Sequence, residues 1–130
     1  MLLKDISFVI PVYNRPNEID ELLKSFSRLE GDKDFEIVII EDGSTEKCDH
    51  IVKSFSDLNI SYHLKSNSGP GDSRNYGMSV AKGKYYVILD SDVILPVNYN
   101  VLLMENFTND FSDCFGGVDD SHQSLSLIHI

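Results

Sequence analysis

Two carboxylates spaced one residue apart, Asp90 and Asp92, directly follow a run of apolar and aromatic residues. The run, Tyr85 to Leu89, is typical of a buried strand, so we expect the carboxylates at its carboxyl end. Side chains alternate along an extended segment, so both carboxylates can face one ion. Hard oxygen ligands suit Mg²⁺ or Mn²⁺, which would stabilise a departing diphosphate. A strand followed by an Asx-type turn gives the same pattern without a metal.

A third carboxylate, Asp42, follows another predicted strand, 35–40, at a turn formed by Gly43 and Ser44. Its side chain could accept the imide N–H of uracil or a similar base, provided that the next helix is capped by Ser44, with Thr45 as the alternative cap, which leaves Asp42 free. Gly43 would let the backbone approach a ligand closely. A simple strand-terminating turn is the alternative.

A glycine-rich loop, 68–75, opens a helix predicted over 72–82. Gly69 and Gly71 permit a close approach of the backbone, and a helix N-terminus offers unpaired N–H groups to an anion. Arg74 lies in the first turn, where it could pair with a phosphate. An ion pair with Asp72 or another neighbouring carboxylate is the alternative.

Alternating strands and helices must position these loops. The pattern predicts strands over 6–12, 35–40, 60–64 and 85–89, and a further strand from Phe115. It predicts helices from an Asn17 cap to Gly31, from Cys48 to Leu58, over 72–82 and over 97–106. This alternation predicts an α/β three-layer sandwich, a mostly parallel sheet with helices on both faces. The polar loops then meet at the carboxyl ends of the strands, where such sheets bind ligands.

Composition narrows the partners. The chain has 130 residues, 42% hydrophobic and 25% charged, which is ordinary for one globular domain. Its formal net charge of -10 argues against a nucleic-acid partner. We expect no signal peptide and no transmembrane segment, because no apolar run has the required length. Cys48 and Cys114 show neither disulfide nor zinc spacing, which favours the cytoplasm.

Four sequence blocks occur in order between Pro11 and Asp92. They are Pro11-Val12-Tyr13-Asn14, Glu41-Asp42-Gly43-Ser44-Thr45, Ser68-Gly69-Pro70-Gly71 with Arg74-Asn75-x-Gly77, and Asp90-Ser91-Asp92. Their order and spacing, which are more specific than any single block, resemble the signature of inverting family 2 glycosyltransferases with the GT-A fold. Glu41 stands where that family often has Asp.

The resemblance implies a Rossmann-like GT-A fold, a nucleotide-sugar donor with UDP-sugar favoured, and Mn²⁺ or Mg²⁺ as cofactor. Asp92 would ligate the metal directly, and Asp90 would address the ribose and the metal. The donor-binding residues that the resemblance implies are Pro11, Tyr13, Asn14, Arg15, Asp42, Gly69, Gly71, Arg74 and Asp90. The acceptor would be a glycan or a lipid-linked glycan, reached in the cytoplasm or at the inner face of the membrane.

Two other functions share these features. One is a nucleotide- or metal-binding module without transfer activity. The other is a sugar nucleotidyltransferase, which would normally carry a glycine-rich basic loop after its first strand. This chain has Tyr13-Asn14-Arg15-Pro16 at that position, which disfavours the second alternative.

The end of the chain raises a separate expectation. In the resembling family an acceptor half with a general base follows, and none of Asp113, Asp119, Asp120 and His122 matches that base. We therefore expect 1–124 to be the donor-binding part of a C-terminally truncated domain that is inactive alone. Residues 125–130, Leu-Ser-Leu-Ile-His-Ile, are what a transposon-end sequencing adapter encodes, so we expect a non-native tail. A genuine apolar strand is the alternative, and the codons of the source gene distinguish the two.

Overall fold

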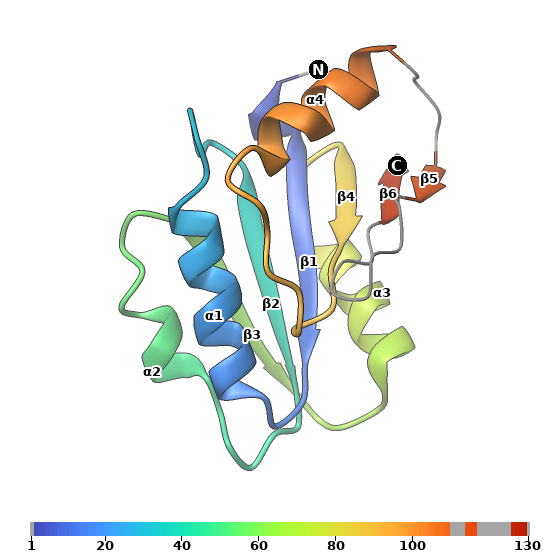
Figure 1. Ribbon diagram of the computed structural model, residues 1–130. Helices are drawn as coiled ribbons and strands as arrows, with labels where there is room; N and C mark the ends of the chain where they lie inside the picture. Colours follow the sequence, from blue (N-terminus) through green and yellow to red (C-terminus); the bar gives the residue numbers. More distant parts are fainter. Residues whose placement is uncertain (1, 110–113, 117–125, 130) are drawn as a thin grey trace.

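The computed structural model describes residues 2–109, 114–116 and 126–129, with side chains described up to Glu105. After a short 3-10 turn, Leu3–Asp5, strands and helices alternate as predicted (Figure 1). The strands are β1 (Ile6–Val12), β2 (Glu36–Asp42), β3 (Asn59–Lys65), β4 (Tyr85–Ile88), β5 (Cys114–Gly116) and β6 (Ser126–His129). The helices are α1 (Pro16–Ser27), α2 (Asp49–Val52), α3 (Pro70–Val80) and α4 (Tyr99–Asn109).

The sheet has the strand order β3-β2-β1-β4-β6-β5. Strands β1 to β4 are parallel to one another, whereas β6 runs antiparallel to β4 and β5 antiparallel to β6. The predicted mostly parallel sheet is confirmed. The chain moves outward from β1 through β2 to β3 and then returns to the other side of β1 with β4. The carboxyl ends of β1 and β4 therefore form a switch point, where open parallel sheets bind ligands.

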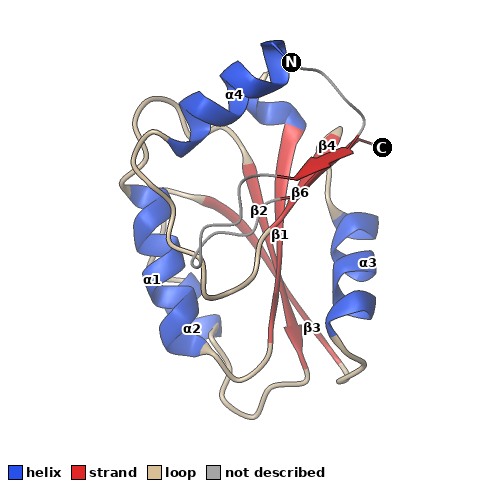
Figure 2. Ribbon diagram, turned by 45° about the vertical axis from the view of Figure 1, so that its right-hand side comes forward, coloured by secondary structure: helices blue, strands red, loops and turns tan. Residues whose placement is uncertain are grey.

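Helices cover both faces of the sheet, so the predicted three layers are confirmed. Figure 2 shows α1 and α2 on one face and α3 on the other. Helix α4 lies across the end of the sheet at which β1 begins (Figure 1). Within the described chain no helix has both the length and the apolar composition needed to cross a membrane.

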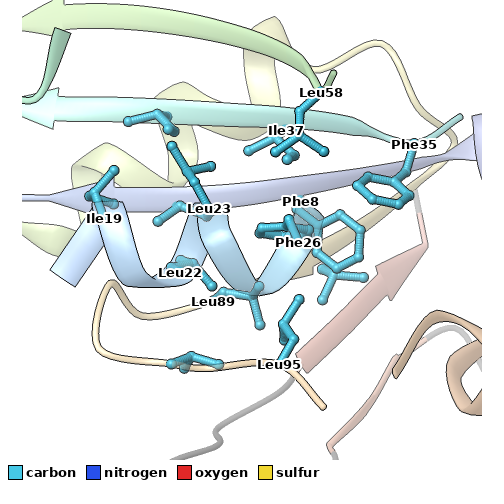
Figure 3. Packing of buried hydrophobic residues seen from close by; sticks show 14 of the residues in the cluster. Phe8, Ile19, Leu22, Leu23, Phe26, Phe35, Ile37, Leu58, Leu89 and Leu95 are labelled. Carbon is cyan, nitrogen blue, oxygen red and sulfur yellow. The ribbon is translucent and has the colours of Figure 1, made fainter. Parts of the chain in front are cut away.

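The larger hydrophobic core lies between the sheet and α1. Ile19, Leu22, Leu23 and Phe26 recur at helical spacing, which turns one face of α1 towards the sheet (Figure 3). Phe8 of β1 meets the Phe26 ring edge-on, with ring centroids 5.0 Å apart. Burial of these side chains supplies most of the force that holds α1 against the sheet.

Close backbone packing holds α3 against the opposite face. A Cβ atom at Gly77 would lie 2.4 Å from Val9 Cγ1 and 3.2 Å from Ile40 Cγ1, so only glycine fits there. The cluster on this face is smaller and contains Val9, Val38, Ile40 and Tyr86, with Met78 of α3 packed against it. This packing brings the start of α3 to the carboxyl ends of β1 and β2.

Several predicted helix boundaries are wrong. Helix α1 is capped by Arg15, with Pro16 in its first turn, because the fixed φ of proline suits that position. It ends at Ser27 and not at Gly31, since the Glu30 N–H leaves the helix to bond the Val97 carbonyl at 2.8 Å.

Helix α2 is much shorter than predicted, and α3 and α4 are displaced. The predicted second helix from Cys48 to Leu58 is reduced to Asp49–Val52. Helix α3 begins at Pro70, two residues before the predicted 72–82, and α4 begins at Tyr99. Beyond α2 the N–H groups of Ser54 and Phe55 bond carbonyls three residues back, at Ile51 and Val52, so the chain leaves the α-helix there.

The C-terminal expectations fall partly on described residues. Ser126–His129 forms β6, paired with β4 from Ile88 opposite Ser126 to Tyr85 opposite His129. This pairing fits the apolar-strand alternative, and the codons of the source gene still decide whether an adapter encodes the segment. Leu125 and Ile130 lie outside the described residues, as do Gly117 and Val118 of the further predicted strand.

Candidate functional site

A cavity of about 200 Å³ opens at the carboxyl ends of β1, β2 and β4. Its volume is below the roughly 300–1,000 Å³ of a site that encloses a whole ligand, so it fits one part of a nucleotide sugar. Its lining includes predicted donor residues from all four loops. The lining residues are Pro11, Val12, Tyr13, Asp42, Pro70, Ser73, Arg74, Asp90 and Ser91.

Asp42 lies buried at the end of β2, with three hydrogen-bond donors around its carboxylate. Its Oδ1 accepts from Lys65 Nζ at 2.6 Å and from the Ser68 N–H at 2.9 Å, and its Oδ2 accepts from the Gly69 N–H at 3.0 Å. Burial alone would raise the pKa of Asp42, but these donors outweigh it, so the pKa lies below its ordinary value. Contrary to the sequence prediction, Asp42 is therefore not free: its carboxylate already binds the backbone of the glycine-rich loop.

Glu41 is fully buried, and its carboxylate, like that of Asp42, accepts several hydrogen bonds. Its Oε2 accepts from the Ser44 hydroxyl at 2.5 Å, and its Oε1 accepts from the Cys48 N–H and the Tyr62 hydroxyl, each at 2.8 Å. Burial and the nearby Glu41 carboxylate raise the pKa of the Tyr62 hydroxyl and of the Cys48 thiol. The predicted helix cap at Ser44 or Thr45 is wrong, because α2 begins only at Asp49 and its N-cap is Cys48.

Asn14 joins the loop after β1 to the loop after β2. It has a left-handed φ of 52°, and its Oδ1 accepts from the backbone N–H groups of Thr45 and Glu46 at 2.8 and 2.9 Å. Its own N–H donates to the Ser44 hydroxyl at 2.8 Å. These contacts pull the β1 and β2 loops together around the cavity, although the Asn14 side chain does not line it.

Arg15, the next residue, is turned to the surface. Its Nε lies 3.1 Å from Glu18 Oε1, and its guanidinium donates to the Asn14 carbonyl at 3.1 Å. The side chain is 61% exposed and does not line the cavity. Its predicted contact with the donor stays a prediction.

The three glycines of this region differ in whether another residue could replace them. Gly69 caps α3 with a φ of 100°, and its carbonyl accepts the first helical bond, from the Ser73 N–H. Gly43 has a φ of 70°, and a Cβ there would lie 2.6 Å from the Asn67 backbone nitrogen. Gly71 is exposed and has open space around it. Neither Gly69 nor Gly71 lines the cavity, although the loop that they shape forms one side of it.

Asp90 and Asp92, the predicted metal ligands, are both exposed. Asp90 Oδ1 lies 3.6 Å from an Arg74 guanidinium nitrogen, so Arg74 pairs with Asp90 and not with Asp72. Asp90 lines the cavity and Asp92 does not. The extended segment predicted for this pair is wrong, because β4 ends at Ile88 and Ser91 and Asp92 form a turn, across which the Val93 N–H donates to the Asp90 carbonyl at 3.3 Å. Among the described residues, no group of three or more His, Cys, Asp or Glu side chains is arranged to hold a metal. Two carboxylates suit Mg²⁺ or Mn²⁺ only where substrate phosphates and water complete the coordination shell.

Two buried polar atoms around the cavity lack partners. Within the described chain, neither Ser73 Oγ nor Arg74 Nε has a hydrogen-bond partner. A buried polar group without a partner costs roughly 1–3 kcal/mol, so both are candidates for ligand contacts. Sequence reasoning missed Ser73, because a lone serine inside a helix carries no recognisable pattern.

Comparison with known proteins agrees with this architecture. The chain belongs to glycosyl transferase family 2, whose sequence profile matches residues 7–126. An uncharacterised glycosyltransferase of Rickettsia conorii is 46% identical over 88 residues, which is 67% of this chain and 14% of that protein. The poly(ribitol-phosphate) β-N-acetylglucosaminyltransferase TarS of Staphylococcus aureus is 37% identical over 126 residues, 94% of this chain and 20% of that protein. The chain thus spans a small part of these relatives' length.

Solved structures show the same fold. The crystal structure of TarS in complex with UDP superposes with a TM-score of 0.77 at 27% identity, covering 89% of this chain and 38% of that one. A mannosyltransferase of Pyrobaculum calidifontis, in complex with GDP-Man and Mn²⁺, gives a TM-score of 0.82 at 18% identity. That match covers 96% of this chain and 44% of that one. The GT-A fold predicted from the sequence is confirmed.

Proposed function

We propose that this chain is the donor-binding part of a glycosyltransferase that uses a nucleoside-diphosphate sugar, with UDP-sugar favoured. The observation that carries the proposal is one cavity, at the switch point of the sheet, lined by Asp42, Arg74 and Asp90 together. These supply a carboxylate for a base, a guanidinium for a phosphate and a carboxylate for a ribose or a metal. The UDP bound to the related TarS supports the choice of nucleotide.

Each part of the donor has a matching group. The cavity is large enough for a nucleoside, with Pro11 and the half-exposed Tyr13 on its β1 side. Asp42 would accept an N–H of the base. Arg74, near the N-terminus of α3, would face the diphosphate, where the helix dipole also favours negative charge. The net charge of the chain is -10, so these local positive groups are needed to bind an anion.

Asp90 and Asp92 would hold Mn²⁺ or Mg²⁺. Their exposed carboxylates fit such an ion, because both are accessible to it. The described residues offer the ion no third carboxylate, histidine or cysteine ligand, so phosphate and water would complete its shell. When bound, the metal would supply Lewis-acid stabilisation to the departing diphosphate. Arg74 would leave Asp90 for the phosphate oxygens, since the pair at 3.6 Å is long and partly exposed.

We further propose that the acceptor is a glycan or a lipid-linked glycan and that this chain does not itself supply the general base. The two carboxylates that line the cavity, Asp42 and Asp90, are already assigned to the donor. The chain alone would then bind donor without transferring sugar. The isolated chain would then behave like the alternative named above, a nucleotide-binding module without transfer activity. The family assignment gives no support to a sugar nucleotidyltransferase.

Calorimetric titration of UDP in the presence of Mn²⁺ tests the proposal. We expect wild type to bind UDP and Asp42→Ala to bind at least about tenfold more weakly, the loss of one charged hydrogen bond. Asp57→Ala is the control, because Asp57 is exposed and precedes β3, away from the cavity. The absence of UDP binding by folded wild type would contradict donor binding. Release of UDP from UDP-N-acetylglucosamine would contradict only the placement of the base.

A further inference from the structure

The ammonium group of Lys65 is fully engaged inside the protein. Its Nζ donates to Asp42 Oδ1 at 2.6 Å, to the Ser66 carbonyl at 2.9 Å and to the Ser68 hydroxyl. An ammonium has three donors, so none remains for a ligand phosphate. The Lys65 side chain is 14% exposed and that of Asp42 is 6% exposed, so the pair is shielded from water.

The donors around Asp42 leave its carboxylate one open acceptor position. A carboxylate has about four such positions, two on each oxygen. Lys65 and the Ser68 N–H occupy both on Oδ1, and the Gly69 N–H occupies one on Oδ2. Because Asp42 lines the cavity, the remaining position on Oδ2 is the one a ligand can use.

We propose that Lys65 is a positioning residue that makes the site select uracil over guanine by filling Oδ1 of Asp42. The inference rests on the proposed function, nucleotide binding in this cavity. Uracil presents a single N–H on its pairing edge, which one acceptor satisfies. Guanine presents two adjacent N–H groups, which a carboxylate receives with both oxygens. One of them would stay unpaired here, and such a loss discriminates strongly between ligands.

The fold alone does not decide the base. Structures with this fold hold UDP in one case and GDP-Man in another. The pairing of Asp42 with Lys65 is a property of this chain's β2–β3 register, in which the two residues are direct partners. We therefore assign the selectivity for uracil over guanine to the contact between Lys65 and Asp42.

The charges that face Asp42 come from several elements. Lys65 lies at the end of β3, Arg74 on α3 and Asp90 after β4. Glu41 precedes Asp42 on β2, and its carboxylate accepts from Ser44, Cys48 and Tyr62. Lys65 is the only one of these in contact with the Asp42 carboxylate among the described residues. Its removal should therefore raise the pH at which Asp42 becomes protonated and UDP affinity falls.

The test is calorimetric titration of UDP and of GDP, each with Mn²⁺, into wild type, Lys65→Met and Lys53→Met. Lys53 is an exposed control next to α2. We expect wild type and Lys53→Met to bind UDP at least about tenfold more tightly than GDP, the effect of one unpaired donor. In Lys65→Met the ratio of UDP affinity to GDP affinity should fall towards one. As the pH is lowered, UDP affinity should also begin to fall at a higher pH in Lys65→Met than in wild type.

Three results would overturn the inference, and they are distinguishable. Equal affinity of wild type for UDP and GDP would refute the selectivity and leave the proposed function intact. An equal loss of both affinities in Lys65→Met, with an unchanged ratio and pH profile, would show that Lys65 only supports the loop. If wild type binds neither nucleotide, the proposed function itself fails. If Lys65→Met does not fold by circular dichroism, Lys65→Ala gives the same comparison, because it also leaves no donor for Asp42 Oδ1.

Discussion

The two sides of the cavity are built differently. On the nucleoside side, Asp42 and Glu41 are buried, and each carboxylate accepts three hydrogen bonds from neighbouring segments. On the metal side, Asp90 and Asp92 are exposed, and within the described part of the chain Asp90 has one ion pair, to Arg74 at 3.6 Å. The nucleoside side is thus organised by the fold itself, whereas the metal side is left for a ligand to complete.

This difference has a thermodynamic consequence. The conformational cost of ordering the nucleoside side is met during folding, so a base can bind there with little rearrangement. The same ordering makes folding sensitive to changes at Glu41, Gly43 and Asp42. Changes at Asp92 should leave folding almost untouched. Substitutions on the two sides therefore test the comparison directly.

The largest effect is expected for Glu41→Ala. It removes the acceptor for three donors, from Ser44, Cys48 and Tyr62, and opens a buried space. We expect a loss of roughly 3–5 kcal/mol in the free energy of unfolding. Urea denaturation measures this change. Tyr62→Phe is the matched variant, since it removes one donor and leaves the carboxylate bonded, and it should lose only about 1 kcal/mol.

Gly43→Ala should be the next most damaging change. It combines a left-handed φ of 70° with a Cβ placed 2.6 Å from the Asn67 backbone nitrogen. Backbone strain and overpacking together should cost roughly 2–4 kcal/mol. Gly71→Ala, which meets open space, is the control and should change stability by less than about 0.5 kcal/mol. Equal stabilities of the two variants would show that the β2 loop and the glycine-rich loop are not packed tightly.

Acid should weaken the nucleoside side through Asp42. Its pKa is lower in the folded chain than the roughly 3.9 of an unfolded chain. Its contribution is therefore complete above the unfolded pKa and is lost as the pH falls through the folded pKa. Asp42→Asn should lose roughly 1.5–3 kcal/mol at neutral pH and show a flatter acid limb. Unfolding free energies measured between pH 2 and pH 7 would contradict this if the acid limbs of both proteins were parallel.

The smallest effect on stability is expected for Asp92→Asn. Asp92 is exposed, and no described contact of its side chain supports the fold. Its unfolding free energy should stay within about 0.5 kcal/mol of wild type, as for other surface substitutions. Thermal unfolding checks this. A destabilisation as large as that of Asp42→Asn would show that the metal side is also built into the fold, and the contrast would fail.

Sequence patterns predicted what depends on local periodicity and motif order. The alternation of strands and helices and the inward face of α1, with Ile19, Leu22 and Phe26, follow from hydrophobic spacing. The convergence of Asp42, Arg74 and Asp90 on one cavity follows from the rule that parallel strands share a carboxyl edge. These features could be predicted because they need no knowledge of exact register.

The contacts that organise the nucleoside side could not be predicted. The Lys65–Asp42 pair joins residues far apart in sequence, and it exists because β2 and β3 pair in one particular register. Parallel register is fixed by core packing and not by a turn, so sequence gives no direct signal for it. For Glu41, the sequence shows only that Glu stands where the resembling family often has Asp. Its hydrogen bond with Tyr62 could not be predicted, because Tyr62 comes from another strand.

Manganese affinity with and without UDP tests the central contrast most directly. Mn²⁺ is titrated into the chain alone, into the chain saturated with UDP and into UDP alone as the correction, with free Mn²⁺ followed by electron paramagnetic resonance. If a ligand completes the metal side, UDP should tighten Mn²⁺ binding at least about tenfold, and Mn²⁺ should tighten UDP binding by the same factor. Asp92→Asn should abolish this coupling. Equal Mn²⁺ affinity in the presence and absence of UDP would contradict the account.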